Sequence, residues 1–299
     1  MDVHAYLNRL GLGDHAGHPP SVPALHALHT AHAERVPYEV LEIWLDRPTT
    51  IDPLDSARRI VAGRGGYCFH LNGAFSALLR ALGYQVTRHV GGVQGTAGDP
   101  AGANANHLVL TVTGLPAPAS PDGAWLVDLG MGDGLHGPLP LVAGDYEQGG
   151  FHYRLRPSEA EPGGWRFDHD PRGSFLGMDF RAEPATMAAF AERHEHLSTS
   201  PESGFVRVAT AARRDATGVD IMRTLILTRV GAQPSRTELT TRADYFAAMA
   251  DIFGITFADV SRAGRDALWS RLSTAHEQWL TRRAASGDPQ PAATPPATV

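Results

Sequence analysis

The chain has 299 residues, of which 42% are hydrophobic and 19% are charged, a composition typical of a folded globular protein. Its formal net charge of -6 gives no excess of basic residues for binding phosphate backbones, so nucleic acid is not expected as a partner. One cysteine cannot form an internal disulfide, the N-terminus lacks the pattern of a secretion signal, and no apolar run approaches the length of a membrane span. We therefore expect a cytoplasmic protein that does not contact membranes.

The first 85 residues predict a helical unit. Apolar residues recur at helical spacing over 2–11, 22–35 and 54–62. The clearest helix is predicted over 68–82, where Gly83 supplies the C-terminal stop. Its apolar stripe, at helical spacing, consists of Leu71, Ala74, Phe75, Leu78, Leu79 and Leu82.

After Gly83 the sequence changes to short β-type segments separated by Gly, Pro and Asp. These segments predict an antiparallel sheet or small barrel from about residue 84 to 175. They lie at 84–93, 107–114, 124–130, 151–157 and 165–170.

The last part of the chain predicts a mixture of strands and helices. Strands are expected near 205–212, 221–230 and 236–241, and helices near 243–253 and 259–283. Helices, then a sheet, then a mixed part form an α+β arrangement. The segment from Ser286 is rich in Pro and Ala without aromatic residues, which predicts disorder.

Cys68, the only cysteine, follows two glycines at the start of the helix predicted over 68–82. At a helix start, unpaired N–H groups and the positive end of the helix dipole favour a thiolate over a thiol. The segment RGGYC therefore indicates an activated nucleophile. A buried, inert thiol is the alternative, because lone cysteines are among the residues most often buried.

A thiolate that attacks acyl groups needs a histidine as general base and acid, and a carboxylate that orients the imidazole. His107 opens the apolar segment HLVLTVT, where its side chain can lie at the rim of the sheet. Asp128 ends the apolar segment AWLV and precedes a glycine-rich turn. Each also has an ordinary explanation as a polar residue at a strand end or in a turn, so spacing alone does not establish a triad.

Longer segments around these residues resemble one known family. RGGYCFHLN is similar to the RGGxC signature of the arylamine N-acetyltransferases, and NHLVLTV and WLVDLGMG follow it in that family's order. RVPYEVLEI at 35–43 and YFAAMADIFGI at 245–255 are similar to two further family segments. The resemblance covers residues 2–280.

The resemblance implies an α+β fold in three parts with a cysteine-protease-like core. The parts differ in their secondary structure and are followed by a tail. They are a helical bundle carrying the nucleophile over 1–84, an antiparallel β-barrel-like domain with an interdomain segment over 85–200, an α/β lid domain over 201–285, and a disordered tail over 286–299.

The resemblance also assigns roles in acyl transfer. Cys68 matches the nucleophile, His107 its base and Asp128 the orienting carboxylate. The implied reaction moves an acetyl or other acyl group from a thioester, with acetyl-CoA as the leading donor, to an aromatic amine or hydrazine. It is a ping-pong mechanism through an acyl-Cys68 intermediate, and it needs no permanently bound cofactor and no metal.

Three positions depart from the family pattern. The family usually carries Glu where this chain has His70, and Phe where it has Tyr38 and Met131. Phe at these last two positions commonly contributes to the acceptor pocket. The expected substrate-binding residues are therefore Tyr38, Tyr67, His70 and Met131, in a pocket of altered polarity and more flexible packing.

His70 has two interpretations. It replaces a Glu of a structural ion pair, with Arg64 as the candidate partner, or it supplies a titratable group for an unusual acyl donor or acceptor. Arg64 and Asn72 are expected to support the loop rather than to take part in chemistry.

Three other functions stay open. Amide synthases of antibiotic biosynthesis belong to the same family and join an acyl chain from a carrier protein to an aromatic amine, so an acyl carrier protein is an alternative partner. A thiol hydrolase or transglutaminase-like enzyme shares the Cys, His and Asp chemistry. A non-catalytic module would bind CoA without acylation of Cys68.

The histidines do not predict a metal site. His26, His29 and His32 lie three residues apart on a predicted helix, a spacing at which the side chains drift around the axis. His194 and His196 form a pair without a third ligand. We expect the first three to be ordinary surface histidines.

Overall fold

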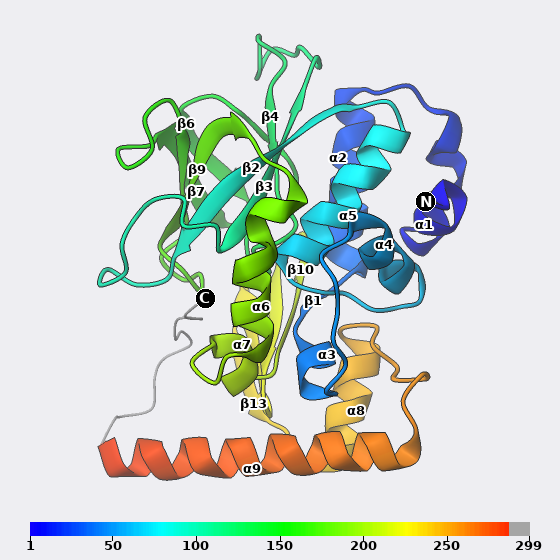
Figure 1. Cartoon of the computed structure of the whole chain (residues 1–299), viewed down its shortest axis with the longest axis vertical. Helices are drawn as coiled ribbons and strands as arrows, with labels where there is room; N and C mark the ends of the chain where they lie inside the picture. The colour runs from blue at the N-terminus through cyan, green and yellow to red at the C-terminus, as the bar shows by residue number, and fades with distance from the viewer. Residues whose placement is uncertain (287–299) are drawn as a thin grey trace.

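The computed structural model describes residues 1–286, and helices build its first part (Figure 1). Asp2, Ser21 and Asp52 accept N–H hydrogen bonds at the starts of three of them, which satisfies donors that a helix leaves unpaired. All four helices predicted in this part are confirmed. The elements are α1 Val3–Arg9, the 3-10 helix η1 Gly13–Gly17, α2 Val22–Arg35, α3 Leu41–Trp44, α4 Pro53–Val61 and α5 Cys68–Ala81.

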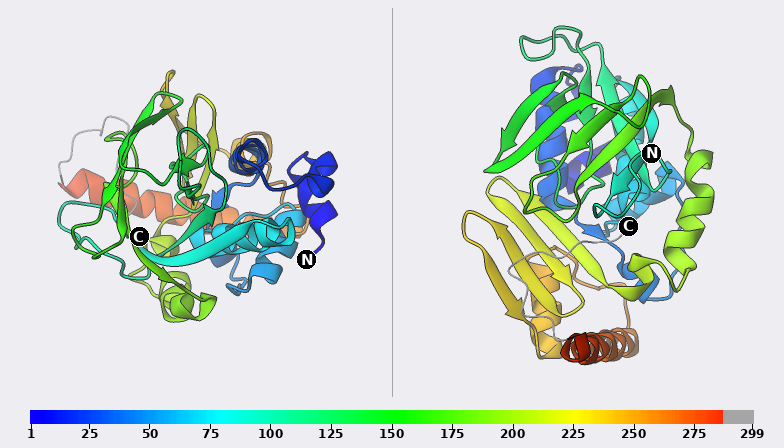
Figure 2. Two further views of the ribbon diagram at one scale, coloured as in Figure 1. Left: turned by 90° about the horizontal axis from the view of Figure 1, so that it is seen from above. Right: turned by 90° about the vertical axis from the view of Figure 1, so that its left-hand side faces the viewer.

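An eight-stranded antiparallel sheet follows, with the strand order β5-β4-β3-β2-β9-β8-β7-β6. It curls into a nearly barrel-shaped layer (Figure 2). Along β7 buried and exposed residues alternate, whereas β3 is buried almost throughout, because α5 packs against it. The strands are β2 Gln85–Gln94, β3 His107–Thr113, β4 Trp125–Val127, β5 Leu139–Pro140, β6 Gly144–Gln148, β7 Phe151–Pro157, β8 Trp165–Asp168 and β9 Gly177–Pro184.

A second antiparallel sheet has the order β1-β10-β11-β12-β13. Its edge strand β1, Tyr38–Glu39, comes from the helical part and pairs with β10 through Tyr38 and Ala212. Helix α9 runs across the lower end of this sheet (Figure 1). The remaining elements are η2 Met187–Phe190, α6 Ala191–Thr199, α7 Gly204–Arg207, β10 Thr210–Asp215, β11 Gly218–Arg223, β12 Ile226–Gly231, β13 Ser235–Glu238, α8 Arg242–Asp251 and α9 Arg262–Ser286.

Two hydrophobic clusters form the interior. The larger one surrounds α5, which buries Phe69 and Phe75, and extends to α8 and α9. The smaller one joins residues of the eight-stranded sheet to residues of β10, β11 and β12 and includes Met131. Tyr38 packs against both clusters, so the place where β1 joins the second sheet is also where the two clusters meet.

The strand predicted at 205–212 is wrong in its first half. Residues Gly204–Arg207 form the helical turn α7, because Ser203 caps it and Phe205 is buried. The Trp44 indole donates to the Phe205 carbonyl at 3.0 Å, which fixes this turn against α3. Strand β10 begins only at Thr210.

The single strand predicted at 221–230 is also wrong, since the segment is a hairpin of β11 and β12. The chain reverses at Thr224, whose φ of 53° is unusual for a β-branched residue. No Gly, Asn or Pro marks this turn, so it gave no signal in the sequence. The sheet predicted to end near 175 extends to Pro184 through β9. The later strand and both C-terminal helices are confirmed as β13, α8 and α9.

The division into domains ending at residues 84, 200 and 285 stays a prediction. In the structure, β1 of the helical part belongs to the sheet formed by residues 210–238. Residue 286 of the predicted tail is the last residue of α9, and the rest of that tail lies outside the described residues. Within residues 1–286 no helix is long and apolar enough to cross a bilayer.

The buried carboxylate of Glu39 gives a test of this fold. It accepts hydrogen bonds from the N–H groups of Leu41, at 2.6 Å, and Gly65, at 3.2 Å. Because Glu39→Ala leaves both donors buried without an acceptor, we expect the free energy of unfolding to fall by about 2 kcal/mol in urea titrations. Glu147→Ala, at an exposed position of β6, is the control. Equal effects of the two substitutions would contradict the role of Glu39.

Candidate active site

Cys68 is the first residue of α5 and is buried. The chain reaches it through Gly65, where a Cβ atom would lie 1.9 Å from the Pro37 carbonyl oxygen, so only glycine fits this close passage. The Glu39 N–H donates to the Gly66 carbonyl at 3.0 Å and joins this passage to β1. The helix start carrying the sulfur is thus held against the strand that contains Tyr38.

His107 and Asp128 lie beside Cys68, as the motif order predicted. His107 begins β3 and Asp128 follows β4, the neighbouring strand, and the His107 Nε2 lies 2.7 Å from the Asp128 Oδ2. The Cys68 side chain is within hydrogen-bonding reach of the His107 ring. Its Sγ also lies 3.6 Å from the Asn106 carbonyl oxygen.

The electrostatics of His107 favour its charged form. Burial alone would lower the pKa of the imidazole, but the charge and hydrogen bond of Asp128, together with Cys68, outweigh burial. The result is a pKa raised from 6.5 to about 10. His107 is therefore an imidazolium at neutral pH, in contact with the cysteine sulfur.

Every oxygen of the Asp128 carboxylate is hydrogen bonded. Oδ2 faces His107, while Oδ1 accepts from the Asn72 amide at 2.9 Å and from the Gly130 N–H at 2.8 Å. The Asn72 side chain, one turn along α5 from Cys68, also accepts from the Leu129 N–H at 2.8 Å. Asn72 supports the loop, as predicted.

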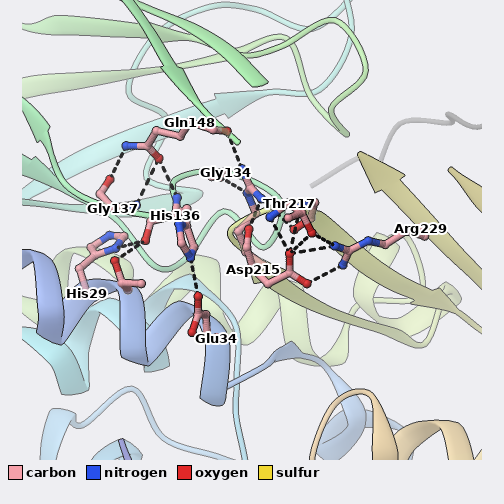
Figure 3. A network of polar contacts seen from close by, with 12 residues as sticks. His29, Glu34, Gly134, His136, Gly137, Gln148, Asp215, Thr217 and Arg229 are labelled. Atoms are coloured by element: carbon pink, nitrogen blue, oxygen red, sulfur yellow. Dashed lines mark hydrogen bonds and ion pairs between the residues drawn. The ribbon is translucent and has the colours of Figure 1, made fainter. Parts of the chain in front are cut away.

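A buried imidazole of α2 contacts both ends of the loop that follows Asp128. The His29 Nδ1 lies 3.1 Å from the His136 carbonyl oxygen (Figure 3). Its Nε2 lies 3.3 Å from the Asp128 N–H nitrogen and 3.2 Å from the Asp128 carbonyl oxygen. A neutral ring that donates from Nδ1 to the His136 carbonyl accepts the Asp128 N–H at Nε2. His136 in turn pairs with Glu34 at 2.8 Å, and the Gln148 amide bonds to the loop beyond it.

A small cavity of about 50 Å³ lies between Cys68 and the second sheet. Gly130 borders it so closely that a Cβ atom there would lie 2.6 Å from the Cys68 Cβ. Of the predicted pocket residues, Tyr38 and Met131 line this cavity, and Tyr67 and His70 do not. Its lining consists of Tyr38, Cys68, Val93, Asn106, His107, Gly130, Met131, Gly132, Asp133, Ser174, Phe175, Phe205, Thr210, Ala212, Ile221 and Arg223.

His70 lies on the other side of the helix start and completes its capping. The Tyr67 N–H donates to the His70 Nδ1 at 3.4 Å, and the His70 Nε2 lies 3.2 Å from the Thr49 hydroxyl. Burial, followed by the nearby charges of Arg59 and His194, lowers the pKa of His70 well below its ordinary value. A neutral imidazole thus makes the contact that a Glu at this helix position makes in a capping box.

Arg64 has a structural role, as expected, but it forms its ion pairs with residues other than the one at position 70. Its guanidinium contacts Asp259 at 2.7 Å and Glu42 at 3.5 Å, and stacks over Phe257. These contacts join the segment before Cys68 to the segment between α8 and α9.

Two larger cavities, of about 260 and 1080 Å³, adjoin the one at Cys68 and share lining residues with it. Within the described part of the chain, their linings include six arginines and a single carboxylate, that of Asp133. The arginines are Arg172, Arg207, Arg223, Arg236, Arg271 and Arg282. A chain of net charge -6 therefore concentrates positive charge in the cleft that leads to its cysteine.

Comparison with known proteins finds relatives that match most of the chain. A sequence model of the N-acetyltransferase family matches residues 21–261. The arylamine N-acetyltransferase of Mycolicibacterium smegmatis is 33% identical over 278 residues, which cover 89% of this chain and 95% of that protein. The chain belongs to the arylamine N-acetyltransferase family.

Solved structures of the family agree in fold. The Mycobacterium marinum arylamine N-acetyltransferase, in a structure with CoA, matches with a TM-score of 0.80 and 26% identity over 92% of this chain and 99% of that one. The enzyme from M. tuberculosis matches with a TM-score of 0.78 and 28% identity over 92% of this chain and 100% of that one. The predicted α+β fold and enzyme class are confirmed.

A relative with another name matches a shorter region. Proansamycin X synthase of Amycolatopsis mediterranei is 33% identical over 165 residues, which cover 53% of this chain and 60% of that protein. The match to this synthase therefore covers about half of the present chain.

The prediction of surface histidines on α2 is wrong for two of the three. His29 and His32 are buried, the first behind Asp128 and the second 2.8 Å from the Tyr6 hydroxyl. Both ring nitrogens of His29 have hydrogen-bond partners, whereas the buried His32 Nδ1 has none among the described residues. Among residues 1–286, no group of three His, Cys, Asp or Glu side chains is arranged to hold a metal ion.

Sequence reasoning missed three residues of the site in this family member. Asn106 fixes β2 against the start of β3, through Val93, at 2.7 and 3.1 Å. His29 and Arg223 come from segments far from the motifs. The Asn preceding His107 was a visible signal, whereas nothing local marked the other two.

The stability of this family member should depend on His29 at mildly acidic pH. Burial lowers its pKa from 6.5 to about 4, so between these values the unfolded chain binds a proton that the folded chain does not. Stability therefore falls as pH falls from 6.5 towards 4. We expect His29→Gln to reduce this slope by up to about 1.4 kcal/mol per pH unit in urea titrations.

His152, exposed on β7, provides the matched control for this measurement. His152→Gln should leave the slope as in the wild type. A slope unchanged by His29→Gln would contradict a neutral imidazole behind Asp128.

Proposed function

We propose that this protein transfers an acetyl group from acetyl-CoA to an aromatic amine or hydrazine by way of an acyl-Cys68 intermediate. The observation that carries the proposal is the contact of Cys68 with a His107 imidazolium held by the buried Asp128, at the inner end of a cleft. In this role Cys68 is the nucleophile, His107 the general base and acid, and Asp128 the orienting group.

Acylation begins when the Cys68 thiolate attacks the thioester carbonyl carbon. N–H groups at the start of α5 are the candidates for stabilising the oxyanion that forms. The bond from the carbonyl carbon to the CoA sulfur then breaks, and the His107 imidazolium gives its proton to that sulfur. CoA leaves as a thiol, and Cys68 carries the acyl group beside a neutral His107.

Deacylation reverses these roles. A neutral amine attacks the acyl carbon, and His107 takes the proton that the amine nitrogen loses. The bond to the Cys68 sulfur breaks, which restores the thiolate and the imidazolium. An aromatic amine suits this step, because it is largely deprotonated near neutral pH, whereas an alkyl amine is protonated and has no free electron pair.

The charge of the cleft supports CoA as the donor. Its diphosphate and phosphate groups are anions, and the two outer cavities offer arginines that fork onto phosphate oxygens. Arg236 and Arg282 make no ion pair with the described residues, so their guanidinium groups are available to a ligand. The structure of the M. marinum relative with CoA agrees with this donor class.

The proposed pocket for the acceptor contains both residues that were expected to replace a family Phe. Tyr38 and Met131 face the cavity at Cys68 together with Phe175 and Phe205. Aromatic rings and a flexible thioether favour a flat, apolar acceptor.

Intact-mass spectrometry tests the proposal. Incubation with acetyl-CoA should add one acetyl mass to the wild type and none to Cys68→Ala, and an aromatic amine should remove the adduct and appear as its amide. Without an amine the adduct should persist, since loss to water at the same rate would indicate a hydrolase. The absence of an adduct with any short acyl-CoA would contradict the proposal.

The match to proansamycin X synthase favours an amide synthase as the second candidate. Such an enzyme would use the same three residues and differ in taking its acyl group from a carrier protein. A wild type that is acylated by a carrier-bound acyl chain, and not by short acyl-CoA thioesters, would identify it.

A further inference from the structure

Tyr38 brings a hydroxyl group to the cavity at Cys68. The residue lines this cavity of about 50 Å³ and also the outer cavity of about 1080 Å³. Within residues 1–286 its hydroxyl forms no hydrogen bond. Buried polar groups are nearly always hydrogen bonded, so a hydroxyl left without a partner on the wall of a cavity is available to a bound group.

The ring of Tyr38 is held in place on several sides. Its backbone pairs with Ala212 in the second sheet and forms a bridge with Gly66, two residues before the nucleophile. A Cβ atom at Gly132 would lie 3.4 Å from the ring, and the Phe205 ring packs edge-on at 6.4 Å between centroids. A donor on a fixed ring needs no reorganisation when a ligand arrives, which is the property that stabilises developing charge efficiently.

The hydroxyl of Tyr38 lies nearer to the sulfur than the guanidinium of Arg223 does. Burial raises the pKa of Tyr38 well above its ordinary value, and among the charges that act on it Cys68 has the largest effect. The charges that act on the pKa of Arg223 are those of Asp133 and Tyr38, and Cys68 is not among them. Because its pKa is raised, the Tyr38 hydroxyl keeps its proton and remains a donor at any ordinary pH.

The other hydroxyl and amide groups around the sulfur already have acceptors. The donors Asn106, Ser174 and Thr210 bond to Val93, Asp133 and Val208, at 3.1, 2.9 and 3.4 Å respectively. The Tyr67 hydroxyl, which also lies near Cys68, bonds to His194. Among the described residues, Tyr38 therefore provides the hydroxyl in this lining that is still free to donate.

The Tyr38 hydroxyl does not bond to the sulfur itself. The Cys68 side chain contacts His107, and its Sγ lies 3.6 Å from the Asn106 carbonyl oxygen. A donor to the thiolate would weaken it as a nucleophile, whereas a donor near the sulfur can reach an oxygen two bonds away from it. That contact arises only once the sulfur bonds to a carbonyl carbon, so it lowers the barrier without stabilising the free enzyme.

The size of the cavity brings such an oxygen to its wall. A cavity of about 50 Å³ has room for a short acyl group and little more. The carbonyl oxygen of an acyl group on Cys68 must therefore lie against the lining, where Tyr38 offers its proton.

We propose that the Tyr38 hydroxyl donates a hydrogen bond to the carbonyl oxygen of the acyl group while Cys68 attacks it. The inference rests on the proposed acyl transfer and deepens it by adding a catalytic residue. As the bond from Sγ to the carbonyl carbon forms, the π electrons move to the oxygen, and Tyr38 stabilises this oxyanion without losing its proton. When the carbonyl re-forms, the bond from its carbon to the leaving sulfur breaks.

Two reagents that modify the same sulfur test this role. p-Nitrophenyl acetate acylates a thiolate through an oxyanion, whereas ethyl iodide alkylates it and carries no oxygen. We expect Tyr38→Phe to slow acylation at least about tenfold, measured as the burst of nitrophenolate in stopped flow. Alkylation followed by intact mass should stay within about twofold of the wild type, because it depends on the thiolate alone. Tyr146→Phe, on β6, is the control and should change neither rate.

A vibrational measurement reports the contact directly. A hydrogen bond weakens a carbonyl bond, so the infrared band of a ¹³C-labelled acetyl group on Cys68 should lie at a lower frequency in the wild type than in Tyr38→Phe. The urea midpoint of Tyr38→Phe should be no lower than that of the wild type, since the hydroxyl has no partner to lose.

Two results would overturn the inference. One is acylation of Tyr38→Phe at the wild-type rate, and the other is an equal loss of acylation and alkylation, which would place the effect on the thiolate instead of the acyl oxygen. Neither reagent contains CoA. Failure of acetyl-CoA to acylate the wild type would therefore contradict the proposed function, while the two rates would still decide the role of Tyr38.

Discussion

The buried carboxylate of Asp128 is the constraint on which the site depends. Its oxygens accept from α5 through Asn72, from β3 through His107 and from its own loop through Gly130, while His29 of α2 contacts its peptide from behind. Burying a charge is unfavourable unless hydrogen bonds compensate for it, so each donor must be in place for the site to form. Two helices, the sheet and the loop are thereby fixed around one side chain, and the position of His107 beside Cys68 follows.

The motifs predicted Cys68, His107 and Asp128, because each lies at the start or end of a regular element whose pattern is local. His29 could not be predicted in the same way, since its role depends on how α2 docks on a loop about 100 residues later in the chain. Arg223 was hidden for a related reason. Strand β11 ends at this residue, and the chain turns at Thr224 without the glycine or asparagine that usually marks such a turn, so the pattern predicted one continuous strand.

The contact of His70 shows how a neutral imidazole can accept the hydrogen bond that a glutamate accepts in a capping box. A glutamate at that helix position would accept the N–H of the capping residue with a charged oxygen, and here a neutral imidazole nitrogen accepts it. The neutral His70 places no charge behind the start of α5. The arginines that line the cleft place positive charge in front of it. Positive charge is thus concentrated around the cleft at Cys68, although the net charge of the chain is negative.

The central claim is that Asp128 keeps His107 protonated beside Cys68, and nitrogen NMR of the histidine rings measures this directly. With a pKa of about 10, the His107 signals should show an imidazolium at every pH from about 6 to 9, and Asp128→Asn should lower the midpoint substantially. A wild-type His107 that loses its proton with a midpoint near its ordinary value of 6.5 would contradict the account.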